Sequence, residues 1–400
     1  MWSQSSPDEQ GDPKLRALYA LIGVTGSAFI PFFALLLRDR GLNPELIGLV
    51  LAVVSLAGVA ATPVWSHVAD ARLGTLPTLR TSCLASCIAG LGMIATGSSF
   101  LAIGSAALVL GAAQGPQTGL TDALALGTLG RPRLHEYGSF RLWASIGWGI
   151  GSIAFGAVFQ GLGLGALLPV YVVALAAYVI FLGRFPTVRP EPGSVARSRL
   201  GSVGDAFRSV PRLAAFLTGV LVLATSTHAA WDFVPLRIVS KGGGAFLVGI
   251  ASGVSAFVEI PFMRSSGSLV RRYGLPRVFA AGAAVYAAAS VGWALFPNPL
   301  AVTILRISVG IGFGLVYVSL VVMTGRLVPD RLRNTGQALL SICLFGLAPV
   351  IGGAAGGLVY QRVGPPELFA ASAVGIAAGT VLVFLAASDA EDVGVRGQAA

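Results

Sequence analysis

Long apolar stretches recur along the whole chain and are separated by short polar turns. Each stretch holds about the 20 residues that a helix needs to cross a ~30 Å hydrocarbon core. The pattern therefore predicts an all-α polytopic membrane protein with twelve transmembrane helices. The predicted spans are 15–37, 45–68, 78–97, 102–127, 140–160, 163–183, 212–238, 245–268, 277–296, 299–323, 335–359 and 366–387.

The longest polar stretch divides these spans into six and six. It contains Pro186, Pro190 and Pro192 with scattered charges, which is typical of a linker. We therefore predict two pseudo-symmetric six-helix bundles. The expected boundaries are a cytoplasmic tail over 1–14, a first bundle over 15–183, a cytoplasmic linker over 184–211, a second bundle over 212–387 and a cytoplasmic tail over 388–400.

The two halves share short motifs at a displacement of about half the chain. Phe29-Ile30-Pro31-Phe32 is matched by Phe233-Val234-Pro235-Leu236, and Ile47-Gly48 is matched by Val248-Gly249. The matches are collinear, as duplication of a six-span unit predicts.

Composition and charge agree with a membrane protein. The chain is 55% hydrophobic and 11% charged, against about 25% charged residues in a typical soluble protein. The net charge of +10 comes from Lys and Arg in short turns, which favours an orientation signal over nucleic-acid binding. Most of these residues fall on one side, so the positive-inside rule predicts a multi-pass cytoplasmic (inner) membrane protein with both termini in the cytoplasm.

Cysteine placement gives no sign of a metal site. Cys83, Cys87 and Cys343 lie in apolar stretches without a nearby His or acidic cluster. They are interpreted as packing residues rather than as a disulfide framework. No cofactor is expected, and a proton gradient is the expected coupling source.

The segment from Gln114 to Gly149 carries the most informative polar pattern. Polar residues recur at helical spacing in two apolar helices, Gln114, Thr118 and Asp122 on the first, Arg141 and Trp148 on the second. A carboxylate and a guanidinium are costly in lipid, so we expect them to face a partner or a wet cavity. Trp148 is either a packing residue or a platform for a solute ring. We predict a substrate-binding site here.

A second polar set lies in the C-terminal half. His228 and Asp232 share a face of span seven, Glu259 lies in span eight and Arg306 lies in span ten. A rise of ~1.5 Å per residue puts Asp232 and Arg306 roughly 10 Å below the same surface. We predict an Asp232–Arg306 charge pair, with Glu259 and His228 as titratable neighbours for proton coupling. The alternative is a set of structural contacts that fix helix register.

Two turns between spans have the composition of gates. Asp70 and Arg72 lie in the turn after span two, and Gly267, Arg271 and Gly274 lie in the turn after span eight. A glycine turn with basic residues is suited to charges that interact with a neighbouring helix end. We predict that both are gating loops.

These two turns resemble the signature loop of the major facilitator superfamily. Thr121-Asp122-Ala123-Leu124-Ala125, and Arg141 seven residues before Trp148, resemble the oligosaccharide:proton symporter branch, which includes lactose permease and the phenylpropionic-acid permease. The resemblance covers nearly the whole chain. It implies that Asp122, Arg141 and Trp148 contact the solute and that Glu259 is the substrate-linked glutamate.

The chain departs from lactose permease within span ten. Arg306 stands where that protein has a histidine, and Val309 stands where it has its proton-carrying glutamate. The proton relay implied by the resemblance therefore does not transfer unchanged to this chain.

The pattern as a whole predicts a secondary active transporter of a small organic solute, working by alternating access and favouring proton-coupled symport. Arg141 and Arg306 favour an organic or aromatic acid over a neutral sugar, since guanidinium groups suit carboxylates. The alternative is proton-driven efflux of amphipathic compounds. The expected partners are the solute, protons and the lipid bilayer, without nucleic acid, and the carrier is expected to be a monomer.

Two other classes of function have less support in the sequence. An intramembrane enzyme is not predicted, because His67, His135 and His228 lie apart without nucleophile–base or metal-ligand spacing. A non-transporting sensor with the same fold would bind a ligand without flux.

Overall fold

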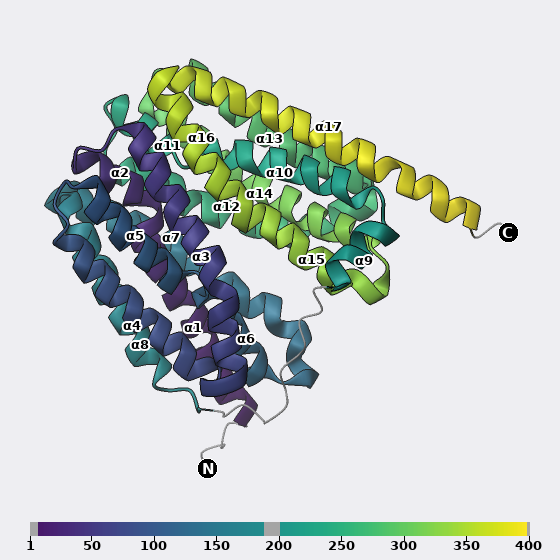
Figure 1. Cartoon of the computed structure of the whole chain (residues 1–400), viewed down its shortest axis with the longest axis horizontal. Helices are drawn as coiled ribbons and strands as arrows, with labels where there is room; N and C mark the ends of the chain where they lie inside the picture. Colours follow the sequence, from purple (N-terminus) through teal and green to yellow (C-terminus); the bar gives the residue numbers. More distant parts are fainter. Residues whose placement is uncertain (1–6, 188–200, 398–400) are drawn as a thin grey trace, which may run out of the picture. The chain divides into compact units, whose positions relative to one another are not determined.

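The computed structural model describes residues 7–187 and 201–397, and the regular elements there are all helical (Figure 1). Ten helical segments in this part of the chain are long and apolar enough to cross a membrane. The prediction of an all-α polytopic membrane protein is confirmed. The ten do not include the predicted third and fourth spans, so a count of twelve stays a prediction.

The predicted fourth span is broken in the structure. It consists of α5 (Phe100–Gln114) and α6 (Gln117–Leu129), separated at Gly115 and Pro116. Each piece is shorter than the ~20 residues that a span needs. Proline lacks the amide hydrogen that would continue the helix ladder, which explains the break at this place.

The remaining elements follow the predicted spans closely. In the first half they are α1 (Pro7–Phe29), η1 (Ile30–Phe32), α2 (Phe33–Asp39), α3 (Pro44–Val68), η2 (Ala69–Leu73), α4 (Thr75–Ile94), η3 (Arg131–Glu136), α7 (Tyr137–Leu162), η4 (Leu164–Ala166) and α8 (Leu167–Leu182). In the second half they are α9 (Gly201–Ser209), α10 (Leu213–Trp231), α11 (Val234–Ser240), α12 (Ala245–Tyr273), α13 (Leu275–Leu295), α14 (Pro299–Leu327), η5 (Asp330–Leu332), α15 (Arg333–Ser341), η6 (Ile342–Leu347), α16 (Ala348–Arg362) and α17 (Pro365–Gly397).

The helix ends differ from the predicted tails and linker. Helix α1 begins at Pro7 rather than at residue 15, and α17 continues to Gly397 rather than ending at 387. The predicted linker over 184–211 contains the short helix α9, and its residues 188–200 lie outside the described part of the chain.

The repeated Phe-x-Pro motif interrupts the first span of each half. The turn η1 separates α1 from α2 at Pro31, and α10 ends at Trp231 before α11 begins at Val234, with Pro235 as its second residue. A proline ring clashes with the preceding helical turn and removes one hydrogen bond. The matching motifs therefore produce matching breaks.

Contacts group the chain into two compact units, each of which takes a short segment from the opposite half of the sequence. Unit 1 is the first half without Asn43–Ala52, but with Gly243–Phe257 added. Unit 2 is the second half without Gly243–Phe257, but with Asn43–Ala52 added. The predicted bundle boundaries do not include this exchange, because it depends on which helices pack together in space.

Small residues allow α1 and α7 of unit 1 to approach closely. A Cβ on Gly23 would overlap the carbonyl oxygen of Ala144, and one on Gly147 would overlap that of Ala20. In lipid, helices associate through such close packing rather than through the hydrophobic effect. Tyr19 and Arg141 lie on these two helices, so the α1–α7 contact sets the distance between them.

In each half, an arginine donates hydrogen bonds to backbone carbonyl groups at the end of the third predicted span, which is α4 in the first half and α13 in the second. Arg40 donates from Nη1 to the carbonyl oxygen of Met93 at 2.8 Å. Arg237, which is only 6% exposed, donates to the carbonyl oxygens of Trp293 and Ala294 at 3.2 and 3.3 Å. The last carbonyl groups of a helix lack partners within the helix, so a guanidinium satisfies them and complements the helix dipole.

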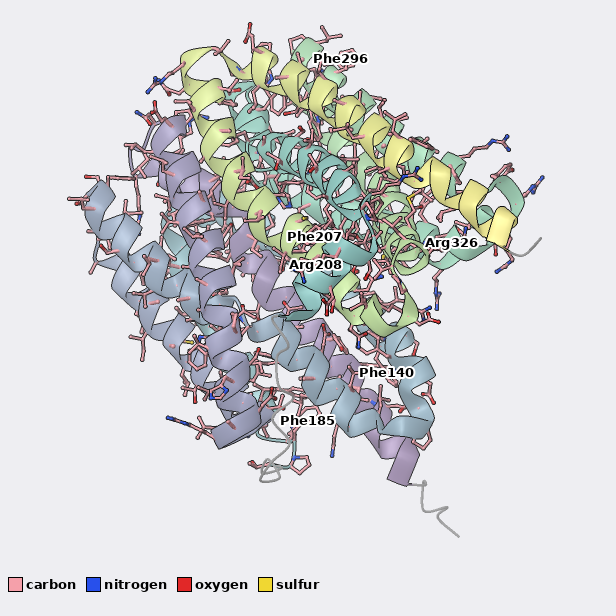
Figure 2. All side chains as sticks on the ribbon, turned by 45° about the vertical axis from the view of Figure 1, so that its right-hand side comes forward. Phe140, Phe185, Phe207, Arg208, Phe296 and Arg326 are labelled. Atoms are coloured by element: carbon pink, nitrogen blue, oxygen red, sulfur yellow. The ribbon has the colours of Figure 1, made fainter. Side chains whose placement is uncertain are left out.

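Side chains on the outer faces of the helices are largely apolar (Figure 2). Ile88, Leu101 and Ile180 are exposed in the structure, and such side chains suit contact with lipid. Arg208 and Arg326, labelled in Figure 2, lie in the last turns of α9 and α14. Cations there complement the partial negative charge of the helix C-terminus.

Candidate functional site

The structure brings Asp122 and Arg141 together within unit 1. Nε of Arg141 lies 3.6 Å from Oδ1 of Asp122, and the hydroxyl of Tyr19 donates to the same oxygen at 2.8 Å. The Arg141 guanidinium carbon is also 5.8 Å from the Tyr19 ring centroid, within cation–π range. The side chains of Arg141 and Asp122 remain 42% and 25% exposed, so a solute can reach the pair.

A hydrogen-bonded cluster holds the turn before α7. Arg133 donates at 2.6 Å both to Asp12 of α1 and to Glu136. Hydrogen bonds to Glu136 and Asp12 raise the pKa of Arg133 above its ordinary value, so it stays charged at any physiological pH. The cluster links the start of α1 to the turn from which α7 presents Arg141.

Trp148 lies two helical turns further along α7. Its Nε1 donates to Oγ of Ser252 at 2.9 Å, and Ser252 lies on the part of α12 that belongs to unit 1. Its ring packs over Gly26, where a Cβ would lie 2.8 Å from a ring atom. Seven residues correspond to ~10 Å along a helix, so Trp148 and Arg141 are two separate points on one helix.

Gln114 does not join this group. Gln114 donates from Nε2 to the hydroxyl of Tyr171 on α8 at 2.9 Å, and the Thr118 side chain is exposed. The helix breaks between Gln114 and Gln117, so Gln114 no longer shares a face with Asp122, whereas Thr118 and Asp122 lie four residues apart on the continuous helix α6. Spacings of four residues define a face only along a continuous helix.

The predicted polar residues of unit 2 gather around Arg306. This arginine interacts electrostatically with Tyr286, Glu259 and Asp232. Its guanidinium carbon lies 5.0 Å from the ring centroid of Trp231. A single guanidinium thus lies among two carboxyl groups and two aromatic side chains.

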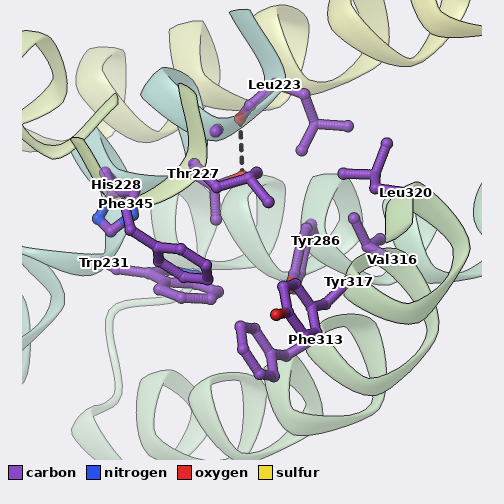
Figure 3. Close-up of a pocket in the computed structure, with 12 residues that line it drawn as sticks. Leu223, Thr227, His228, Trp231, Tyr286, Phe313, Val316, Tyr317, Leu320 and Phe345 are labelled. Atoms are coloured by element: carbon purple, nitrogen blue, oxygen red, sulfur yellow. Dashed lines mark hydrogen bonds between the residues drawn. The ribbon is translucent and has the colours of Figure 1, made fainter. Parts of the chain in front are cut away.

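His228 lies beside this network and lines a cavity within unit 2 (Figure 3). The cavity encloses about 470 Å³ when the solvent space at its open mouth is included. The imidazole is hydrogen-bonded to the backbone of Leu344, in the π-helical segment η6. Wide helical turns of this kind leave backbone groups available for side chains and often mark functional sites.

The cavity is mainly aromatic. Six of its lining residues carry rings, His228, Trp231, Tyr286, Phe313, Tyr317 and Phe345, and the other six are Leu, Ala, Val and Thr side chains. We name this space the aromatic cavity. Every lining residue belongs to unit 2.

The predicted gate residues lie on helical segments rather than in open loops. Asp70 and Arg72 are exposed in η2, which extends α3, and Gly267 and Arg271 are exposed in the last turns of α12. Arg271 donates to Oγ of Ser268 at 3.0 Å. The chain reverses only afterwards, and Gly274 has a φ of +83°, a conformation that favours glycine.

The sequence-based prediction named Trp148 but missed Tyr19 of unit 1 and Trp231 of unit 2. Tyr19 contacts Asp122 and Arg141, and Trp231 contacts Arg306. A signal was available in the second half, because Phe313 and Tyr317 are four residues apart and therefore share a face of α14. Ring spacing of this kind is as common in packed cores as in sites, so only the cavity distinguishes them.

No group of three or more His, Cys, Asp or Glu side chains is placed to hold a metal ion within residues 7–187 and 201–397. The two clusters offer carboxylates, guanidinium groups and aromatic rings.

A family model described as the MFS_1 like family matches residues 14–371. The chain is 26% identical over 362 residues to the maltose permease of Geobacillus stearothermophilus, with 88% of this chain and 89% of that protein covered. It is 26% identical over 250 residues to the probable 3-phenylpropionic acid transporter of Escherichia coli (strain K12), with 61% and 64% covered.

Solved structures share the fold. The nucleoside transporter NupG aligns with a TM-score of 0.79 at 18% identity, over 94% of this chain and 98% of that chain. An auto-inhibited POT family peptide transporter aligns with a TM-score of 0.74 at 10% identity, over 95% and 97%. At these identities the similarity concerns the fold alone.

Proposed function

The chain belongs to the MFS_1 like family, and on that premise we propose that this multi-pass membrane transporter carries a small organic anion into the cell together with protons. The proposal includes alternating access, a place in the cytoplasmic membrane and both termini in the cytoplasm. Among the relatives, one is named a maltose permease and one a probable 3-phenylpropionic acid transporter. Arginine in both polar clusters favours an acid over a sugar.

The charge balance around Arg306 carries the proposal. One guanidinium interacts with two carboxyl groups, those of Glu259 and Asp232. An unpaired charge inside a membrane protein is costly, so one arginine compensates only one carboxylate. The network is neutral when the second carboxyl group holds a proton, and this supplies a site for an exchangeable proton.

Binding of an anion changes this balance by one charge. A solute carboxylate pairs with a guanidinium through two parallel hydrogen bonds. At Arg306 it would displace Glu259, and the network would regain neutrality when Glu259 takes up a proton. The proposed coupling is therefore one proton for each monovalent anion, and the loaded carrier is electrically neutral at this network.

The proposal is tested by proton uptake in proteoliposomes. Addition of 3-phenylpropionate to wild-type vesicles is expected to raise the external pH, because protons enter with the anion. Glu259→Gln cannot accept a proton and is expected to lose this signal. Glu45→Gln is the matched control, since Glu45 pairs with Arg362 at exposed helix ends and lies outside the network.

Unchanged proton uptake in Glu259→Gln would remove Glu259 from the mechanism. Uptake of maltose with no response to organic acids would contradict the proposed solute class. The direction of transport is measured in right-side-out and inverted vesicles. Net outward movement driven by protons would replace symport with efflux.

A further inference from the structure

The aromatic cavity has rings on several of its walls. Trp231 and Tyr286 meet edge to face, with centroids 5.5 Å apart at 87°. Phe313 and Tyr317 are stacked, with centroids 5.5 Å apart at 3°, and Phe345 lies 5.8 Å from Tyr317. Aromatic surfaces attract other rings through offset-stacked and edge-to-face contacts.

The polar groups of the cavity are few, and two of them already have backbone partners. The hydroxyl of Thr227 donates to the carbonyl oxygen of Leu223 at 2.8 Å (Figure 3). His228 is hydrogen-bonded to the backbone of Leu344. The other hydroxyl groups of the lining are those of Tyr286 and Tyr317. A sugar buried here would leave most of its hydroxyls without partners, at a cost for each one.

A positive charge lies beside two of the residues that line the cavity. Trp231 and Tyr286 both line it, and both lie next to Arg306. A cavity lined by rings with no positive charge nearby would bind an organic cation through cation–π contacts. Here the guanidinium already lies over the Trp231 ring, and its charge disfavours a second cation.

We propose that the aromatic cavity is a ring-binding subsite for arenecarboxylates, with the solute's aromatic ring among Trp231, Phe313 and Tyr317 and its carboxylate directed toward Arg306. The subsite deepens the proposed function by assigning the solute class, and its carboxylate end rests on that proposal. The ring end stands on the lining of the cavity alone.

The experiment is equilibrium binding to the purified full-length protein in detergent, without a proton gradient. The probes are 3-phenylpropionate, benzoate, 3-cyclohexylpropionate, propionate, maltose and benzyltrimethylammonium. We expect 3-phenylpropionate to bind about a hundredfold more tightly than propionate, because burial of a ring contributes at this scale. Maltose and the cation are expected not to compete.

Variants of one wall residue locate the ring. Phe313→Ala is expected to weaken 3-phenylpropionate binding about tenfold, and Phe313→Leu, which keeps an apolar side chain, is expected to weaken it less. Both should leave propionate binding unchanged. Phe384→Ala is the matched control, because Phe384 packs against Phe279 in unit 2 and is not part of the lining.

Three results would overturn the subsite. The first is binding of no arenecarboxylate, or equal affinity for propionate and 3-phenylpropionate. The second is equal loss of binding in Phe313→Ala and Phe384→Ala. The third is tighter binding of benzyltrimethylammonium. Failure of the proton-uptake test would refute the coupling but leave this binding result standing, because no gradient is used here.

Discussion

Substitution of Gly147 by alanine tests whether helix contact in unit 1 maintains the Asp122 cluster. An ideal Cβ on Gly147 would lie 2.8 Å from the carbonyl carbon and 2.9 Å from Cα of Ala20. Carbon atoms pack at about 3.5 Å or more, so α1 and α7 must separate by at least ~0.7 Å. Tyr19 is the neighbour of Ala20, and the 5.8 Å between its ring centroid and the guanidinium carbon of Arg141 on α7 would lengthen to ~6.5 Å, beyond the cation–π limit of about 6 Å.

Two measurements follow from this displacement. Overpacking of this kind costs about 1–3 kcal/mol, so the apparent melting temperature of Gly147→Ala should fall below that of the wild type. Solute affinity should fall as well, because the Tyr19–Arg141 contact weakens. Thermal unfolding in detergent and equilibrium binding report the two effects separately.

A second glycine of the same helix supplies the control. A Cβ on Gly161 meets no atom within 4 Å, and alanine is a better helix former than glycine by up to about 1 kcal/mol. Gly161→Ala should therefore melt at or above the wild-type temperature. If Gly147→Ala melts at the same temperature as Gly161→Ala and binds solute normally, the close α1–α7 contact does not position the cluster.

Three further predictions concern single side chains. Tyr19→Phe removes a hydrogen bond to the carboxylate of Asp122 and should weaken solute binding roughly tenfold or more, measured by titration; normal affinity would mean that Tyr19 does not hold Asp122 in place. Arg237→Leu should lower stability by about 1–3 kcal/mol in a thermal melt, because it leaves carbonyl groups at the end of α13 unsatisfied; an unchanged melt would contradict this. Arg362→Gln should cost less than about 1 kcal/mol, and less still at high salt, since its 2.9 Å ion pair with Glu45 is exposed; a large loss insensitive to salt would show that the pair is more than a surface contact.

The sequence located the polar clusters better than it located their individual contacts. Asp122 and Arg141 were each predicted to face a partner or a wet cavity, and they lie 3.6 Å apart. Arg306 was predicted beside Asp232 and Glu259, and it interacts with both. The reason is energetic, since charges within apolar helices must find partners wherever the helices pack.

Gln114 shows where that reasoning stops. Its spacing from Asp122 suggested a shared face, yet the break at Pro116 separates the two helices. A neutral side chain can form hydrogen bonds with several kinds of partner. The bond from Gln114 to Tyr171 therefore depends on how α5 packs against its neighbours. The same holds for Trp148, whose partner Ser252 lies over one hundred residues away in the sequence.

The sequence by itself determined the membrane-spanning helical class and the repeated Phe-x-Pro motif, because both depend only on the local order of residues. Tertiary structure alone decided the exchange of Asn43–Ala52 and Gly243–Phe257 between units, and the assembly of the aromatic cavity from α10, α13, α14 and η6. Apolar and aromatic side chains look alike in a sequence whether they face lipid, a packed neighbour or a void. Only the packing of helices distant in the chain separates these three environments.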